Sequence, residues 1–346
     1  MFKTISFYRL ENFQSPDLDA LEQAMAGGAF VPCTPTQPES SGWVAPRGKK
    51  SVTLAERVGG HLLLQLCTER RALPASAINA ALEERIEKYM EETGRERVGG
   101  KMKKQFKEEV VLDLLPRAFS KRSSTLVWLD AELQMLVLNT SSSAVSDKVI
   151  SLLIDALANL PGRNASFIVK PVQTQLAPAT CMAQWLSSRD APPGFTVDQD
   201  CELKTPDDRK SSVRYARHTL EIDEINQHIT EGKLPTQLAM TWNSRVSFVL
   251  NDKGQVKKIK LLDVVMEGVK ESGEDGFDAD AAIATGELCQ LIPDLLDALG
   301  GEMDAMAAPV TAPVMEPTVI ASPKAPSASG GSGGSGPTPP WEDAAS

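Results

Sequence analysis

Two hydrophobic patterns divide this chain into predicted strands and helices. Residues 2–10, FKTISFYRL, alternate loosely between apolar and polar positions and predict a β-strand. A helix is predicted at 17–26, with Ser15 as its cap and Pro16 in its first turn. Residues 30–43 predict a loop rich in proline and serine. Further strands are predicted at 51–56, 61–67, 124–129, 135–139, 167–172, 195–201, 212–220, 237–251 and 256–263, and further helices at 144–160, 178–188, 224–231 and up to 299.

The strongest helical pattern predicts a hairpin of two helices at about 74–115. Residues 74–92 place Ile78, Leu82 and Ile86 on one face, and the glycine-containing stretch 94–100 interrupts the pattern. Residues 101–115 then bring Met102, Phe106, Val110 and Leu114 to a single stripe. At about 1.5 Å per residue, each helix is roughly 22–28 Å long, so the hairpin is expected to project from the rest of the chain.

Two similar orders of elements predict an internal duplication. LLPRAFSKRSSTLVWLD, a second strand and a helix ending LLIDALANLPG occupy the first half. KLPTQLAMTWNSRVSFVL, a second strand and a helix ending PDLLDALGG occupy the second. The fold class expected is therefore α+β, with duplicated antiparallel-sheet/helix halves at 1–162 and 163–303 and the helical hairpin inserted in the first.

Residues 304–346 differ in composition from everything before them. Proline, alanine, serine and glycine dominate and no apolar period survives, which is typical of a disordered tail. The tip contains Trp341 beside two acidic residues, and this tip is a candidate docking segment for a partner protein. The alternative is that the tail only improves solubility.

The formal net charge of −10 is unevenly distributed. Residues 263–346 contain 15 acidic side chains and two lysines, which leaves a net charge of about +3 on residues 1–262. A locally basic surface is therefore compatible with the acidic total. No stretch has the length of an apolar membrane span and the N-terminus shows no secretory signal, so we expect a cytoplasmic protein without membrane contact.

Motifs for catalysis and metal binding are not found. GRERVGGKM at 94–102 misses the phosphate-loop spacing by one residue and ends in methionine instead of a hydroxyl residue. The acidic stretch 273–282 lacks calcium-loop spacing, and there is no GxSxG. The five cysteines are scattered, without CxxC or a histidine at ligand spacing, and are predicted to be reduced thiols. We therefore expect no enzyme activity, no cofactor and no metal.

Basic residues form three groups that are candidates for binding nucleic acid. The first surrounds Phe119 and the predicted hairpin, and contains Lys101, Lys103, Lys104, Lys107, Arg117, Lys121 and Arg122. The second contains Lys204, Arg209, Lys210, Arg214 and Arg217, and the third contains Lys257, Lys258 and Lys260 with the nearby Arg245 and Lys253. Lysine and arginine next to an aromatic ring can bind phosphates and stack on a base. The plainer interpretation is that Phe119 belongs to the core and the cations form a solvated rim.

Several segments resemble the recombination-associated RdgC family of bacteria. They are FKTISFYRL, AFVPC with GWVAPRG, LLPRAFSKRSSTLVWLD, EINQHITEGKLPTQLAMTWNSRVSFVL and FDADAAIATGELCQLIPDLLDALGGE, which together extend over about residues 1–303. The resemblance implies a ring-shaped homodimer that encircles double-stranded DNA without sequence preference, competes with RecA and associates with the nucleoid. It also implies that Phe119, Arg217 and His218 lie near contacts that close the ring. His218 stands where the family often has glutamine, so its role is open.

Two other functions are compatible with the sequence. An interaction scaffold could recruit a partner through the acidic tail, with DNA contact secondary. A metal-dependent nuclease could use the acidic C-terminal region.

Overall fold

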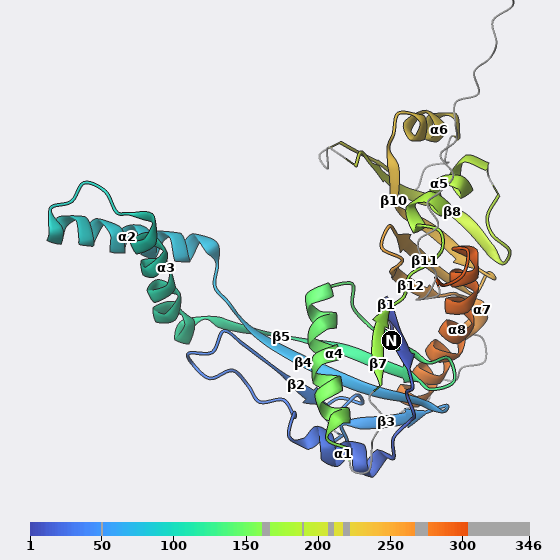
Figure 1. The fold of residues 1–346 in the computed structure, drawn as a ribbon, viewed down its shortest axis with the longest axis horizontal. Helices are drawn as coiled ribbons and strands as arrows, with labels where there is room; N and C mark the ends of the chain where they lie inside the picture. Colours follow the sequence, from blue (N-terminus) through green and yellow to red (C-terminus); the bar gives the residue numbers. More distant parts are fainter. Residues whose placement is uncertain are drawn as a thin grey trace, which may run out of the picture. The chain divides into compact units, whose positions relative to one another are not determined.

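The computed structural model describes residues 1–49, 51–160, 167–188, 190–206, 211–216, 222–266 and 276–303, except the side chains of 222, 223 and 266. The chain divides into two units, Met1–Met303 and Asp304–Ser346, of which the second lies outside the described residues. The first unit combines a large antiparallel sheet with eight α-helices among the residues described, as expected of an α+β protein (Figure 1).

The strands pair into one twelve-stranded sheet, in which all strand pairs are antiparallel. Its order is β2 (Glu39–Val44), β4 (His61–Ala72), β5 (Phe119–Asp130), β6 (Met135–Leu138), β1 (Thr4–Glu11), β12 (Val256–Leu261), β11 (Val246–Asn251), β10 (Leu234–Trp242), β8 (Phe195–Lys204) and β9 (Ser212–Tyr215), with β3 (Ala55–Val58) on β4 and β7 (Ile168–Pro171) on β1. The central strand β1 pairs with β6 of the first half and β12 of the second. The N-terminal strand thereby joins both halves in one sheet.

Two hydrophobic cores form where helices cover this sheet. In the first, α1 (Leu18–Ala26) and α4 (Ser143–Ala158) bury Leu21 and Leu153 beside Trp43. In the second, α5 (Pro178–Ser188) and α8 (Gly276–Ala298) bury Met182 and Leu291. Each such side chain stabilises the fold by about 1.5–3 kcal/mol relative to exposure. Helices α6 (Ile222–Thr230) and α7 (Asp263–Met266) complete the second half.

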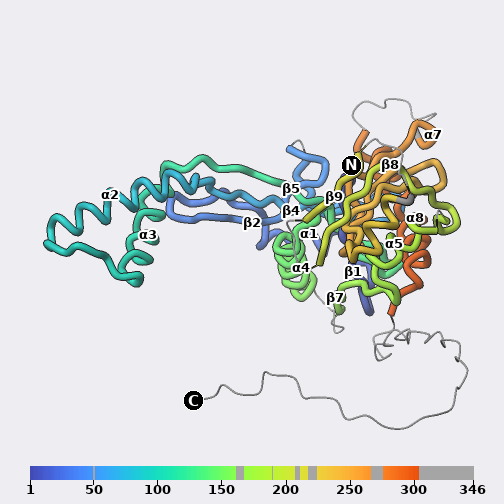
Figure 2. Tube along the Cα trace, turned by 90° about the horizontal axis from the view of Figure 1, so that it is seen from above, coloured from blue at the N-terminus to red at the C-terminus, as the bar shows by residue number. Residues whose placement is uncertain are grey.

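The predicted hairpin is confirmed as α2 (Ala75–Thr93) and α3 (Gly100–Leu114), which lie at the far end of the β4–β5 ribbon (Figures 1 and 2). Gly94 ends α2 with φ of 68°, a left-handed conformation that glycine adopts without strain, and its N–H donates to the Met90 carbonyl oxygen. Phe106 is buried between the helices, with its ring centroid 5.3 Å from that of Tyr89. The apolar stripe of α3 therefore packs on α2.

Several predicted boundaries were wrong. The cap of α1 is Asp17, whose carboxylate accepts from the N–H groups of Asp19 and Ala20, in place of Ser15 and Pro16. The predicted loop 30–43 ends in β2, and the strand expected at 51–56 is β3, Ala55–Val58.

The duplication of the two halves stays a prediction. In the first half, β5 and β6 precede α4, and in the second, β10, β11 and β12 precede α7 and α8. The expected boundary at residues 162 and 163 lies outside the described residues.

Candidate nucleic-acid interface

Strand β5 has two differently exposed parts. Its first six residues, from Phe119, are exposed and its last six, to Asp130, are buried. Pairing with β4 begins at Phe119, opposite Ala72, so the strand starts five residues before the predicted 124. Because side chains alternate along a strand, Phe119 and Lys121 share one face and Arg122 lies on the other. The polar half of β5 thus presents one cation on each face of the sheet.

Phe119 is 88% exposed, so its interpretation as a core residue is wrong. The turn before it is fixed by Arg71, whose guanidinium donates to the carbonyl oxygens of Leu115 at 3.2 Å and Ala118 at 3.4 Å. The 3-10 helix η1 (Leu115–Arg117) leads from α3 into this turn. The ring is therefore presented to solvent by an ordered backbone and is available for contact.

Arg122 is partly engaged within the chain. Its guanidinium lies 3.4 Å from the Glu69 carboxylate and 5.1 Å from the centroid of the Phe30 ring. The pKa of Glu69 is lowered although the side chain is buried. The causes are a hydrogen bond from Ser120, a hydrogen bond from the Cys33 backbone N–H, and the positive charge of Arg122. The ionised Glu69 offsets part of the charge that Arg122 offers to a phosphate.

The other cations of the first group are exposed, and no carboxylate among the described residues lies within ion-pair distance of any of them. They are Lys101, Lys103, Lys104, Lys107, Arg117 and Lys121. The four lysines of α3 lie within an arc of about 160° around the helix, because successive residues are about 100° apart. Their charges therefore gather on one side of α3.

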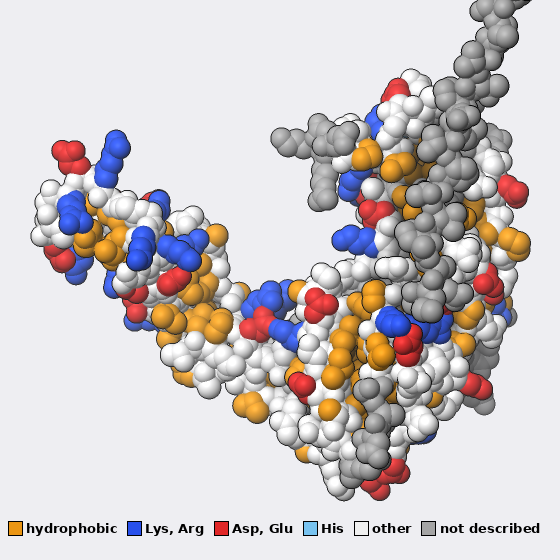
Figure 3. All heavy atoms as spheres, viewed as in Figure 1, with side chains coloured by type: hydrophobic (Ala, Val, Ile, Leu, Met, Phe, Trp, Pro, Cys, Tyr) orange, Lys and Arg blue, Asp and Glu red, His pale blue; other side chains and the backbone are white. Residues whose placement is uncertain are grey.

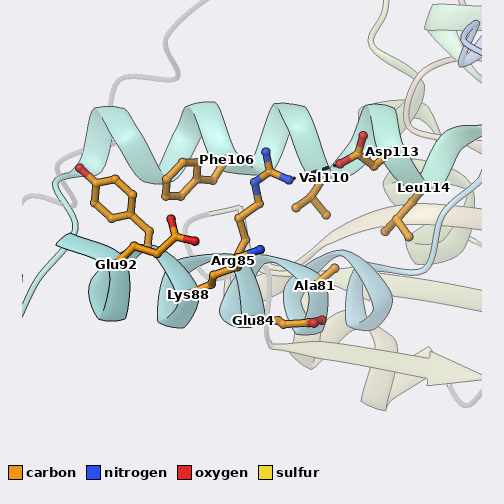
Figure 4. A pocket seen from close by; sticks show the side chains of 10 residues that line it. Ala81, Glu84, Arg85, Lys88, Glu92, Phe106, Val110, Asp113 and Leu114 are labelled. Carbon is orange, nitrogen blue, oxygen red and sulfur yellow. Dashed lines mark hydrogen bonds and ion pairs between the residues drawn. The ribbon is translucent and has the colours of Figure 1, made fainter. Parts of the chain in front are cut away.

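The groove between α2 and α3, about 520 Å³ in volume, contains internally paired charges (Figure 4). Arg85 lies 2.6 Å from Glu109 and 3.4 Å from Asp113, and its guanidinium is 6.0 Å from the Phe106 ring centroid. Arg85 therefore stabilises the hairpin and is not among its free cations.

The second group is described in part. Lys204 pairs with Glu202 at 3.1 Å, whereas Arg214 on β9 is exposed and has no ion pair with any described residue. The predicted residues Arg209, Lys210, Arg217 and His218 lie outside the described residues.

The three lysines of the third group lie on β12, whereas the nearby Arg245 pairs with Glu287. Lys258 has φ of 52° at a register shift between β11 and β12, which is typical of a β-bulge. Lys257, Lys258 and Lys260 have no carboxylate within ion-pair distance in the described part of the chain.

The three groups lie at separate points along one sheet. Strands β6 and β1 separate β5 from β12, and β9 forms the opposite edge. At about 4.8 Å per strand these intervals are roughly 15 and 19 Å. Figure 3 shows lysine and arginine side chains in several separate places on one face of the molecule. The arrangement suits a long polyanion better than a compact ligand.

Sequence reasoning missed Arg70. It lies opposite Lys121 in the β4–β5 register, its side chain is 71% exposed, and it pairs with Glu39 at 2.6 Å. The signal was the polar run after Cys67, which continues β4 to Ala72.

These observations define a class: an α+β protein in which one antiparallel sheet and a projecting helical hairpin present cations that have no ion-pair partner among the described residues. The family model described as "Putative exonuclease, RdgC" matches residues 1–302. The chain is similar to proteins named "Recombination-associated protein RdgC" from Dechloromonas aromatica (strain RCB), at 40% identity over 87% of this chain and 98% of the relative, and from Cupriavidus pinatubonensis, at 39% over 88% and 99%. The relative from Bordetella pertussis is 36% identical over 87% and 98%. The chain belongs to the RdgC family, and its relatives carry names that refer to recombination.

Among the described helices, none combines the length and the apolar character needed to cross a bilayer.

Proposed function

We propose that two copies of this chain bind double-stranded DNA through its phosphates, close around it as a ring, and limit the access of RecA to that DNA at the nucleoid. The observation that carries the proposal is the set of ten exposed or half-exposed cations on α3, η1, β5, β9 and β12 for which the described residues supply no carboxylate partner. When a protein binds DNA, unpaired lysine and arginine side chains on its surface neutralise phosphates and release the counterions that were bound to them.

A dimer strengthens this arrangement without new chemistry. Two-fold symmetry would double each cationic group around one axis. Enclosure would then slow dissociation even though single contacts are weak. Phe119 and Lys121 lie exposed on the same face of β5. We infer that they contact either the second subunit or the DNA.

The salt dependence of duplex binding tests phosphate contact directly. Neutralisation of about six phosphates predicts a slope near −5 in a plot of log affinity against log salt concentration. Fluorescence anisotropy with two duplexes of unrelated sequence should give the same slope and affinity. A salt-independent affinity, or a strong preference for one duplex, would contradict the proposal.

A charge-matched pair of variants localises the contact. Lys121→Ala should weaken binding to every duplex by a similar factor, because a phosphate contact carries no sequence information. Lys170→Ala removes the same charge from a lysine that already pairs with Glu11 at 2.6 Å, and should bind as the wild type does. Equal losses in both variants would show that only total charge matters.

Two alternatives have their own tests. The description of the family model names an exonuclease, and a metal-dependent nuclease predicts magnesium-dependent shortening of linear duplex by the purified chain. If the chain is a scaffold that acts through its tail, removal of residues 307–346 should abolish recruitment of the partner protein. In the ring proposal the same deletion leaves DNA affinity unchanged or raises it, because the tail carries net negative charge.

A further inference from the structure

His61, Asp130 and Cys289 converge from three elements that are far apart in sequence. They stand at the start of β4, the end of β5 and within α8, respectively. The distances are 3.2 Å from His61 Nδ1 to Asp130 Oδ2, 3.4 Å from Cys289 Sγ to the same oxygen, and 3.8 Å from Cys289 Sγ to His61 Nε2. Within the described ranges, no other trio of histidine, cysteine or acidic residues meets so closely.

The rest of the fold holds two of these side chains in place. The second carboxylate oxygen of Asp130, Oδ1, accepts from the backbone N–H groups of Glu132 at 2.9 Å and Leu133 at 2.8 Å. This leaves Oδ2 directed at the other two groups. The His61 ring packs edge-on against Trp128, with centroids 5.3 Å apart and planes at 80°. The cluster is therefore prearranged, with Asp130 only 3% exposed.

The donor set is one that zinc binds. Zinc binds imidazole nitrogen, thiolate sulfur and carboxylate oxygen at about 2.0–2.3 Å, which places donors of a tetrahedral site about 3.3–3.8 Å apart. Asp130 Oδ2 lies 3.2 Å from His61 Nδ1 and 3.4 Å from Cys289 Sγ, beside and within this window. The imidazole ring gives one nitrogen to a metal, and one ligand atom from each of the three residues lies within 4.8 Å of the other two. A thiolate ligand disfavours magnesium and calcium, which take oxygen donors. Three protein ligands leave the fourth position to water.

We propose that His61, Asp130 and Cys289 form a zinc site that fastens α8 to the β4–β5 strands. The thiol of Cys289 loses its proton to solvent when the metal binds, and its sulfur forms the bond to zinc. The site joins the last described helix to the first half of the sheet, so a bound metal would cross-link these elements. It is separate from the cationic groups assigned to DNA.

Metal analysis of the untagged full-length chain tests the site. After chelator treatment and buffer exchange, the protein should take up one zinc per chain, and its Tm should rise by about 5 °C at zinc concentrations well above the dissociation constant. Cobalt in place of zinc should give the near-ultraviolet charge-transfer absorption of a thiolate ligand. A chain that takes up no zinc at micromolar free metal, or a cobalt spectrum without the thiolate band, would overturn the proposal.

Variants assign the ligands. Cys289→Ser and His61→Gln should each lose at least 10-fold in zinc affinity. Cys33→Ser removes a thiol that contacts the Glu69 carbonyl oxygen, outside the cluster, and should retain one zinc. Unchanged zinc affinity in both cluster variants would place the metal elsewhere and refute the assignment. If either variant misfolds, judged by circular dichroism, the cobalt spectrum of the unmodified chain still decides.

Discussion

The contacts of Glu69 show how single residues set the charge of the β4–β5 ribbon. This buried carboxylate accepts from the Cys33 backbone N–H at 3.2 Å and pairs with Arg122. Its ionised form is favoured in the folded chain, so the charge of Arg122 is partly offset near neutral pH.

The lowered pKa of Glu69 predicts a pH dependence of stability. A carboxyl whose pKa is lower in the folded than in the unfolded chain stabilises the fold above the unfolded value, and this contribution is lost as pH falls through the folded value. A decrease from pH 7 to pH 3 should therefore lower the Tm of the wild type more than the Tm of Glu69→Gln. Thermal denaturation at a series of pH values measures both. Identical pH profiles would show that Glu69 does not contribute.

Phe119 provides the second prediction at the residue scale. Because the side chain is 88% exposed, Phe119→Ala should change the free energy of unfolding by less than about 0.5 kcal/mol. If the ring lies in a subunit contact, the variant should weaken dimerisation by about tenfold or more in sedimentation experiments.

Phe106 is the matched control for Phe119. Phe106→Ala should lower the free energy of unfolding by about 3 kcal/mol, because this ring is buried. A large loss of stability in Phe119→Ala would contradict the exposed position.

At the scale of elements, the helical hairpin depends on a few contacts across its groove. Arg85→Ala removes the contacts to Glu109, Asp113 and the Phe106 ring, and should destabilise the hairpin by roughly 1 kcal/mol. Hydrogen exchange should become faster in α2 and α3 while β1 and β6 keep their protection. Equal acceleration in β1 would mean that the hairpin and the sheet unfold together.

Elements with buried faces could be predicted from the sequence, and exposed ones could not. The hairpin helices and β6 were expected nearly at their observed bounds, because their apolar positions repeat with a clear period. The polar half of β5 has no such period. Its residues form a strand because they pair with β4, which is far away in the sequence. Arg70 was missed for the same reason, because it lies in the polar part of β4 that pairs with β5.

The candidate sites show the same division. Composition identified the cationic groups, but whether a carboxylate offsets each charge depends on contacts such as Lys204 with Glu202 and Arg122 with Glu69. The exposure of Phe119 depends on the path of the backbone through η1. His61, Asp130 and Cys289 have no common spacing in sequence, and only the sheet and α8 bring them together.

For the molecule as a whole, the proposed function requires that a dimer encloses duplex DNA. The most direct measurement compares the lifetime of the complex on a nicked circular duplex with that on a linear duplex of the same sequence and length, after a salt challenge. Enclosure predicts a long lifetime on the circle and a short one on the linear molecule, because only a free end lets a closed ring slide off. Equal lifetimes on both molecules would contradict the account.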